Sequence, residues 1–276
     1  MFCCSCWPRS SGGGSTSPSV ALIMEPTFGT LTVMFPMWNE EEMIHRTVGA
    51  ARETGEDLIA AGHIGDYEIL IVDDASTDAT GKIADELAAK DLRVRVVHHA
   101  ENRKLGGSVR TGLDESRGDL VLYTDADMPF DLADLGKALR LMRVYDADIV
   151  SAYRFDRTGE GGVRALYSYV YNTLVKLILR LKIRDVNFAF KLLRKNVIKH
   201  LELESEGSLI DVELLAKAQR LGFHIIQFGV DYFPRDRGTS TLSSPAVIVN
   251  IVKELTHLLP SMRRVERLPE RALRHR

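Results

Sequence analysis

Two aspartates one residue apart, Asp125 and Asp127, are the residues of this sequence best suited to chemistry. They follow Leu120 to Tyr123, a short apolar run typical of a buried strand. Carboxylates in this position form a hard-oxygen site for Mg²⁺ or Mn²⁺, which bind carboxylates together with substrate phosphates and water. No Cys or His is nearby in the sequence, which disfavours zinc. The alternative is a turn whose aspartates cap a helix beginning near Leu132.

Two further polar clusters also follow apolar runs. Asp73 to Asp78 comes after Ile69 to Val72, and Pro36 to Glu41 comes after Leu31 to Phe35. In a parallel sheet the carboxyl ends of the strands share one rim, where ligands bind. We therefore expect the clusters to converge with Asp125. Carboxylates gathered in this way are costly unless a cation or hydrogen-bond donors offset their repulsion.

The chain contains neither of the common glycine-rich phosphate-binding patterns. A turn with backbone donors spans Lys104 to Gly107, and Arg110 lies one turn into the helix expected after it. Lys104, Arg110 and these backbone groups are candidates for binding a diphosphate. A surface turn with a solvated lysine is the alternative.

The elements that must position these residues alternate between strand and helix. The expected strands are Leu31 to Phe35, Ile69 to Val72, Val94 to Val97, Leu120 to Tyr123, Ile149 to Ala152 and Ile225 to Val230. The expected helices are Glu40 to Leu58, Thr77 to Lys90 (capped by Ser76 or Thr77), Gly106 to Ser116, Leu132 to Val144, Ala165 to Leu181, Ile210 to Leu221 and Val247 to Leu259. Asp185 to Arg194 looks like a loop that enters a further strand. Because the apolar runs are continuous, they predict a mostly parallel sheet with helices on both faces, in one α/β domain.

Composition limits the classes of partner. The 276 residues are 45% hydrophobic and 27% charged, and the net charge is −2, so no overall field attracts nucleic acid. The three cysteines all precede residue 7, which suits a reducing, cytoplasmic location. We expect a disordered extension over residues 1–28, the catalytic domain over 29–243, and an amphipathic helix with a basic tail over 244–276. Within the domain, 29–152 would bind the nucleotide sugar and 153–243 the acceptor.

Three stretches together resemble the signature regions of family 2 glycosyltransferases of GT-A fold, a Rossmann-like α/β fold. They are Phe35 to Glu41, Val72 to Asp78 and Thr124 to Asp127. Within that family the chain is similar to dolichyl-phosphate mannose synthase and bacterial polyprenyl-phosphate glycosyltransferases. Asp185 to Arg194, Asp211 to Glu213 and Arg235 to Ser240 carry that closer resemblance.

The resemblance implies a role for each matching residue. A nucleoside pocket would be lined by Pro36, Trp38, Asn39 and Glu40. Asp74 would bind the base, Asp125 the ribose and the metal, and Asp127 the metal directly. Arg235 would bind phosphate, whereas Asp211 and Glu213 would face the acceptor, unless they simply form an exposed helix face.

The chain departs from the family pattern at two points. Trp38 stands where tyrosine is usual, which is an exchange of one aromatic residue for another. More seriously, Met128 to Asp131 replaces the Leu-Gln-His-Pro that many relatives have after the aspartate pair. The glutamine that helps to hold the metal in some relatives is therefore missing, and whether Asp131 replaces it is open.

The implied reaction is the metal-dependent, inverting transfer of a hexose, mannose or glucose, from GDP-mannose or UDP-glucose to a polyprenyl (dolichyl-type) phosphate. An acceptor that is already anionic needs little help from a base. Transfer to a soluble or polymer hydroxyl is the alternative, and Asp211 or Glu213 would then take the proton. The third hypothesis is that the chain is a nucleotide-sugar-binding protein without catalytic activity.

The expected helix from Ala165 to Leu181 carries three tyrosines among leucines, flanked by lysines and arginines. It could be ordinary core. Alternatively, together with the arginine-rich C-terminal tail, it could lie against the cytoplasmic face of a membrane.

Overall fold

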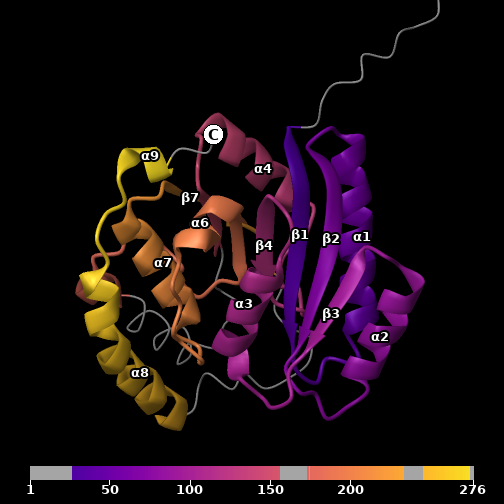
Figure 1. The fold of residues 1–276 in the computed structure, drawn as a ribbon, viewed down its shortest axis with the longest axis horizontal. Coiled ribbons are helices and arrows are strands. Elements are labelled where there is room, and N and C mark those ends of the chain that lie inside the picture. Colours follow the sequence, from indigo (N-terminus) through magenta and orange to yellow (C-terminus); the bar gives the residue numbers. More distant parts are fainter. Residues whose placement is uncertain (1–26, 156–172, 174, 233–244, 274–276) are drawn as a thin grey trace, which may run out of the picture.

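The computed structural model describes residues 27–155, 173, 175–232 and 245–273, which form one sheet with helices on both faces (Figure 1). The three cysteines, Arg235 and most of the helix expected from Ala165 to Leu181 lie outside these residues.

The sheet has seven strands among the described residues, in the order β3-β2-β1-β4-β6-β5-β7. Neighbouring strands are parallel except in the two pairs that contain β6. The strands are β1 (Phe28–Met37), β2 (Ile64–Asp73), β3 (Val94–His98), β4 (Leu120–Thr124), β5 (Ile149–Arg154), β6 (Phe190–Arg194) and β7 (Ile225–Val230). The predicted mostly parallel α/β sheet is confirmed.

The helices form a layer on each side of this sheet. Helices α1, α2 and α4 pack on one face, whereas α3, α6 and α7 lie in front of the sheet in Figure 1, with α8 against α7. The helices are α1 (Ile44–Ala60), α2 (Thr80–Lys90), α3 (Lys104–Glu115), α4 (Asp134–Val144), α6 (Lys195–His200), α7 (Ile210–Leu221), α8 (Pro245–Arg264) and α9 (Glu270–Leu273). None of the helices in the described ranges is long and apolar enough to cross a membrane.

Each face of the sheet has its own apolar core, which explains why the strands read as continuous apolar runs. Successive side chains of a strand point to opposite faces, so Phe35 and Leu122 enter the core under α1 and α4. Their neighbours Met34 and Val121 enter the core under α3 and α7. All four side chains have exposed fractions of 0%.

The start of α2 differs from the prediction. The helix begins at Thr80, its N-cap position is Ala79, and no side chain caps it. Ser76 and Thr77, the predicted caps, bind Asn39 instead. Capping residues and loop-bridging residues have the same chemistry, so the sequence alone did not separate the two roles.

Candidate active site

The carboxyl ends of β1, β2 and β4 meet at one rim of the sheet, toward the bottom of Figure 1. Parallel pairing places Met37 of β1 beside Asp73 of β2, and Met34 of β1 beside Tyr123 of β4. Asp125 follows Tyr123 by two residues. The three polar clusters that the sequence assigned to one rim therefore lie there.

Asn39 connects the loop after β1 to the loop after β2. Its φ of 57° lies in the left-handed region, which asparagine tolerates better than most residues. Its backbone N–H donates to Oγ of Ser76 at 3.0 Å, and its Oδ1 accepts from the N–H of Thr77 at 2.8 Å. Oε2 of Glu41 accepts from the N–H of Ala79 at 2.8 Å, which extends the junction. Asn39 thus shapes the rim by holding two loops together.

The other residues predicted for the nucleoside pocket surround this junction. Trp38 is 55% exposed beside the polar rim, Pro36 is half-buried, and the N–H of Glu40 donates to Oγ1 of Thr80 at 2.8 Å. An aromatic ring left in solvent is a surface on which a nucleobase can stack. The arrangement suits a nucleoside, and the role of each residue remains a prediction.

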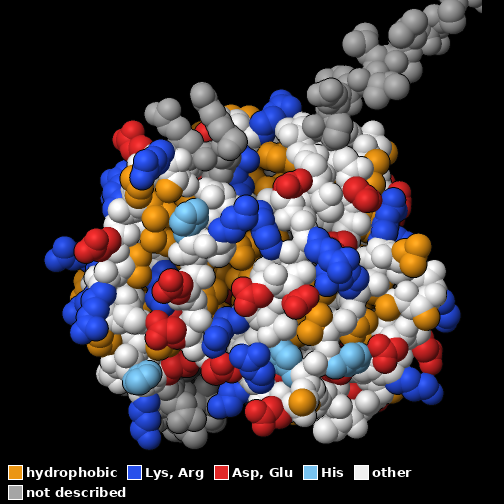
Figure 2. Space-filling model, in the orientation of Figure 1, with side chains coloured by type: hydrophobic (Ala, Val, Ile, Leu, Met, Phe, Trp, Pro, Cys, Tyr) orange, Lys and Arg blue, Asp and Glu red, His pale blue; other side chains and the backbone are white. Residues whose placement is uncertain are grey.

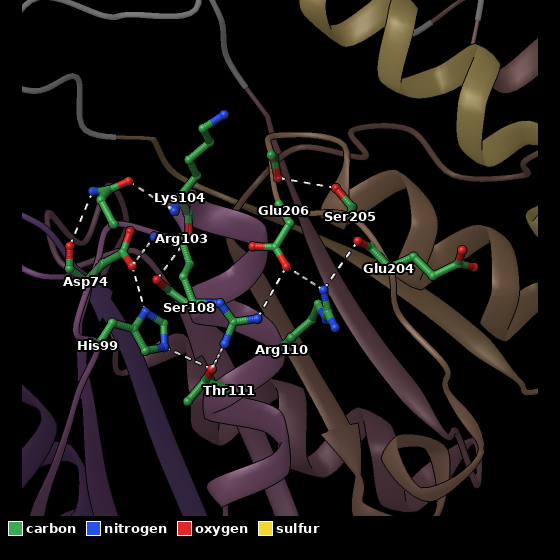
Figure 3. A network of polar contacts seen from close by, with 12 residues as sticks. Asp74, His99, Arg103, Lys104, Ser108, Arg110, Thr111, Glu204, Ser205 and Glu206 are labelled. Atoms are coloured by element: carbon green, nitrogen blue, oxygen red, sulfur yellow. Dashed lines mark hydrogen bonds and ion pairs between the residues drawn. The ribbon is translucent and has the colours of Figure 1, made fainter.

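Asp73 and Asp74 are almost fully buried, with exposed fractions of 5% and 3%. Oδ1 of Asp74 lies 2.6 Å from Nδ1 of His99 and accepts from the N–H of Arg103 at 2.7 Å (Figure 3). Oδ2 of Asp73 lies 2.8 Å from Nδ1 of His98. These partners offset the repulsion between the two carboxylates, as the sequence required.

His98 is held at both ring nitrogens. Its Nε2 lies 3.0 Å from Oδ1 of Asp85, opposite the contact to Asp73. The hydrogen bond to Asp85, followed by the one to Asp73, raises the pKa of His98 above its ordinary value. The proton on His98 therefore stabilises this part of the rim.

Asp125 and Asp127 follow β4 in a bend, in which the N–H of Met128 donates to the carbonyl of Asp125 at 3.3 Å. Both side chains are half-buried. Asp131 is exposed, and its Oδ1 accepts from the N–H of Ala133 at 2.9 Å, just before α4. Nowhere in the described part of the chain do three His, Cys, Asp or Glu side chains gather as a metal site.

This donor set has a clear chemical meaning. Two half-buried carboxylates at a rim suit a hard divalent cation that takes its remaining ligands from phosphate oxygens and water. Oδ1 of Asp131 stabilises the turn that leads into α4. Asp125 and Asp127 as metal ligands, and Asp131 as a further one, stay predictions.

The first turn of α3 is docked against the loop that precedes α7. The N–H of Lys104 donates to Oδ1 of Asn102 at 3.1 Å, and the N–H of Gly106 donates to the carbonyl of Glu206 at 3.0 Å. A Cβ atom on Gly106 would lie 2.3 Å from the carbonyl oxygen of Ser205. Close packing therefore explains this glycine. Both backbone donors bind protein acceptors in this structure, and their contact with a diphosphate stays a prediction.

Arg110 faces the same loop (Figure 3). Its guanidinium lies 2.7 Å from Oε1 of Glu206, an oxygen that also lies 3.3 Å from the guanidinium of Arg103. Arg110 donates in addition to the carbonyl of Glu204 at 3.3 Å. A phosphate-binding role for Arg110 would require it to leave this pair.

Glu213 is buried and does not lie on an exposed helix face. It is 0% exposed, and its two oxygens accept from the N–H groups of Glu204 and Ser205 at distances between 2.8 and 3.1 Å. Nζ of Lys217 lies 2.7 Å away as its counter-ion. Glu213 thus anchors the loop that docks on α3, and its catalytic role stays a prediction.

Asp211, in the first turn of α7, is also buried rather than exposed, with an exposed fraction of 3%. Its carboxylate lies 2.6 Å from Nζ of Lys191, which is 0% exposed. Burial raises the pKa of Asp211 above its ordinary value, although the charge of Lys191 opposes that shift.

Comparison with known proteins places this site in a family. The sequence model described as Glycosyl transferase family 2 matches residues 32–202, which include Asp74, Asp125 and Asp127. The chain belongs to this family. It is therefore a glycosyltransferase, as the three signature stretches predicted.

Three curated relatives are similar to this glycosyltransferase. Glycosyltransferase AglD of Haloferax volcanii is 33% identical over 74% of this chain, but the chain spans only 33% of AglD. Undecaprenyl-phosphate mannosyltransferase of Micrococcus luteus is 28% identical over 81% of this chain and 92% of its own length. Polyprenol monophosphomannose synthase of Mycolicibacterium smegmatis is 29% identical over 85% of this chain and 87% of its own.

Solved structures agree on the fold. Mannosyltransferase PcManGT of Pyrobaculum calidifontis, solved with GDP-Man and Mn²⁺, matches with a TM-score of 0.55 and 21% identity over 78% of this chain and 59% of its own. Mannosyl-3-phosphoglycerate synthase of Rubrobacter xylanophilus matches with a TM-score of 0.63 and 19% identity, over 87% and 77%. The predicted GT-A fold of this glycosyltransferase is confirmed.

Sequence reasoning missed three residues that hold the site of this glycosyltransferase together. His98 and His99 had a detectable signal, because they stand at the end of β3, the next strand in the chain after β2, which ends at Asp73. The structure shows that His98 pairs in register with Asp73. The sequence signal for Lys191 was weaker, because it consists only of a lysine inside the apolar strand β6. Arg235, the predicted phosphate ligand, lies outside the described residues.

Proposed function

We propose that this glycosyltransferase transfers mannose from GDP-mannose to a polyprenyl phosphate. The observation that carries the proposal is the similarity to two polyprenyl-phosphate mannosyltransferases over 92% and 87% of their own lengths. Similarity over nearly the whole of both relatives includes the part of the chain expected to bind the acceptor.

The rim provides the parts that such a reaction needs. The bond between the anomeric carbon and the diphosphate breaks while a phosphate oxygen of the acceptor forms a new bond on the opposite face of the sugar, which inverts the configuration. A divalent cation, Mg²⁺ or Mn²⁺, held by Asp125 and Asp127 would neutralise the charge that develops on the leaving diphosphate. Arg235 is proposed to bind the same diphosphate.

The donor is proposed to lie across the ends of β1 and β2. The exposed ring of Trp38, with Pro36 and Glu40 beside it, would pack against the nucleoside. The carboxylate of Asp74, oriented by His99 and by the N–H of Arg103, would accept hydrogen bonds from the base.

The state of Asp211 favours an anionic acceptor over a hydroxyl. A hydroxyl acceptor needs a base within hydrogen-bond reach of its proton. Asp211 is almost fully buried and paired with Lys191, and Glu213 is fully buried with both oxygens bound. A phosphate acceptor carries its negative charge already, so it makes no such demand on either residue.

The test is a transfer assay with labelled donor. The full chain is incubated with labelled GDP-mannose or UDP-glucose and Mg²⁺ or Mn²⁺, with and without a short-chain polyprenyl phosphate. Label that becomes extractable into organic solvent only with GDP-mannose and the lipid supports the proposal. Water-soluble product would instead support a hydroxyl acceptor, and an unconsumed donor would support a non-catalytic binding protein. Either result contradicts the proposal.

We further propose that a basic edge of the molecule lies against an anionic membrane. Exposed basic side chains occur where α8 ends and continue beyond it, with Glu266 and Glu270 between them: Arg263, Arg264, Arg267 and Arg271. Figure 2 shows basic side chains, with acidic ones among them, along the left edge of the molecule. Arg263 donates to the carbonyl of Ile178, and the neighbouring Leu177 is 79% exposed. Cationic groups around an exposed apolar side chain suit the boundary between lipid headgroups and acyl chains.

Vesicle flotation tests this contact. The full chain should float with vesicles that contain an anionic lipid at low salt, and it should be released at high salt. The matched control is a variant in which Arg263, Arg264, Arg267 and Arg271 are replaced by glutamine, which should stay in the dense fraction. Failure of the unmodified chain to float at low salt would contradict the proposal.

A further inference from the structure

A lysine lies in the interior of the sheet, next to the candidate active site. Lys191 of β6 is 0% exposed and sits in register between Tyr123 of β4 and Ser151 of β5. The hydroxyl groups of both neighbours are buried and make no hydrogen bond to any described residue. A charged group at such a position is costly unless its partners compensate, so its presence calls for a specific reason.

The partners of Lys191 come from three separate elements. Nζ lies 2.6 Å from Oδ1 of Asp211 in α7 and donates to the carbonyl of Phe188 at 2.9 Å. It also lies 5.4 Å from the ring centroid of Tyr123. One ammonium group thus joins α7, the turn that enters β6, and the strand that ends beside Asp125.

The same turn leads to a second ion pair. Asp185 precedes Phe188 in the turn and binds the guanidinium of Arg154 through two contacts, at 2.8 and 3.2 Å. Arg154 is the last residue of β5, on the same rim as Asp125. Lys191 therefore connects the first turn of α7 to a cation at the end of a neighbouring strand.

Stability alone is a weak explanation for this arrangement. A buried ion pair replaced by apolar side chains of similar volume often leaves a protein as stable as before, whereas removal of one partner is strongly destabilising. What a charged pair provides, and an apolar pair does not, is one fixed direction and distance between the elements that it joins.

We propose that Lys191 is a positioning residue of the transfer reaction. Its ammonium group fixes Asp211 and the turn of residues 185–188 against the end of β4, and this sets the geometry in which the acceptor meets the sugar. Lys191 itself touches no substrate atom. The inference rests on the transfer activity proposed above.

The test replaces the charged pair by an apolar pair, Lys191→Met with Asp211→Leu. The double variant should keep a melting temperature close to that of the unmodified protein, because no buried charge is left alone. Its kcat/KM for the polyprenyl phosphate should fall by about 30-fold or more, since small misplacements of reacting groups cost about 100-fold. The KM for GDP-mannose should stay within about twofold, since the donor is expected to bind at β1 and β2.

Two single substitutions complete the design. Lys191→Arg keeps a cation beside Asp211 and should recover part of the loss, with an acceptor KM about threefold to tenfold above normal. Lys195→Met is the control: Lys195 also bonds to a neighbouring segment, at Ser116, but at the start of α6 beside the other end of β4. It should leave both KM values unchanged.

The outcomes separate clearly. A folded double variant with normal acceptor kinetics would overturn the inference and leave the pair with a purely structural role. If the double variant does not fold, Lys191→Arg decides: a raised acceptor KM with a normal donor KM supports positioning, and normal values for both overturn it. Absence of lipid product from the unmodified protein would contradict the proposed function instead, and the two failures are thereby distinguished.

Discussion

Buried carboxylates have different partners in the two halves of the rim, the half at the end of β2 and the half around Asp211 and Asp185. At the end of β2, Asp73 and Asp74 are bound by two histidines and by backbone N–H groups. In the other half, Asp211 is paired with Lys191 and Asp185 with Arg154. The first arrangement orients the carboxylates with histidine rings and backbone N–H groups, whereas the second pairs each carboxylate with the side chain of a lysine or an arginine.

The difference fits two different tasks. The carboxylates at the end of β2 lie on the same rim as Asp125 and Asp127, and a cleft lined by acidic side chains attracts a divalent cation. Carboxylates that are neutralised by buried cations place no negative charge in the path of an anionic acceptor. The comparison predicts that substitutions in the first half will affect metal and donor, and that substitutions in the second will affect acceptor and stability.

The largest effect is expected from Asp127→Asn. Loss of the carboxylate removes a direct ligand of the proposed cation, so transfer should fall by about 1000-fold while the protein stays folded. Asp131→Asn is the matched control, because Asp131 is exposed and its Oδ1 binds the turn before α4; it should stay near normal turnover. The two variants are compared by transfer rate and by circular dichroism. Near-normal turnover of Asp127→Asn would rule out the metal assignment.

A smaller effect is expected from Asp74→Asn. The change replaces a charged acceptor of hydrogen bonds by a neutral amide, and a hydrogen bond to a charged group is worth about 1.5–3 kcal/mol. The KM for GDP-mannose should therefore rise by about 10- to 100-fold, with a lesser change in kcat. Initial rates at varied donor concentration measure it. A drop in kcat at an unchanged donor KM would show that Asp74 acts in the chemical step rather than on the base.

In the acceptor half, Glu213→Leu should act on stability. The substitution leaves Lys217 without one of its two acidic partners and leaves the N–H groups of Glu204 and Ser205 without acceptors. We expect a loss of about 3 kcal/mol in the free energy of unfolding, measured by urea denaturation. If the variant were as stable as the unmodified protein but inactive, Glu213 would have a catalytic role rather than a structural one.

The smallest effect concerns pH. Because Asp85 and Asp73 raise the pKa of His98 in the folded protein, protonation of His98 favours folding. The contribution is fully present below the unfolded pKa of about 6.5 and is lost as pH rises through the higher folded pKa. His98→Gln should therefore destabilise the protein more at pH 6 than at pH 9.

His63 provides the opposite case for the same experiment. Burial, then the charges of Arg140 and Arg143, lower the pKa of His63. The neutral form is favoured in the folded state, so His63 costs stability as pH falls below about 6.5. His63→Gln should consequently help the protein at low pH, and urea denaturation across a pH series measures both variants. If the free energies of unfolding of the two variants changed with pH in the same direction, the assignment of opposite pKa shifts to His98 and His63 would be contradicted.

The sequence predicted the sheet well because its signals are local. Helix α7 and strand β7 have the bounds that apolar periodicity assigned to them, Ile210–Leu221 and Ile225–Val230. The direction of β6 was beyond such reasoning, because a short apolar run is the same in a parallel and in an antiparallel strand. Only the pairing with β4 and β5 reveals it.

The site was predicted only in part for a related reason. The acidic residues at the ends of β2 and β4 were identified because strand ends and residue types are visible in the sequence. Glu213 was misjudged because the same carboxylate serves in solvent or in the interior, and its burial depends on the loop that folds over it. Lys191 and Asp211 are 20 positions apart, and no local pattern shows that they meet.

The reversed direction of β6 has a consequence for how this enzyme can vary. Because β5 runs toward the rim and β6 runs away from it, the chain leaves the sheet at Arg154 and re-enters at Phe190 on the same side. A connection that begins and ends at one rim can differ between relatives without any change in strand order. Exchange of residues 156–172 for those of a relative is therefore expected to leave β5, β6 and the donor residues at β1 and β2 in place, and a changed acceptor preference of such a chimera would assign these residues to the acceptor site.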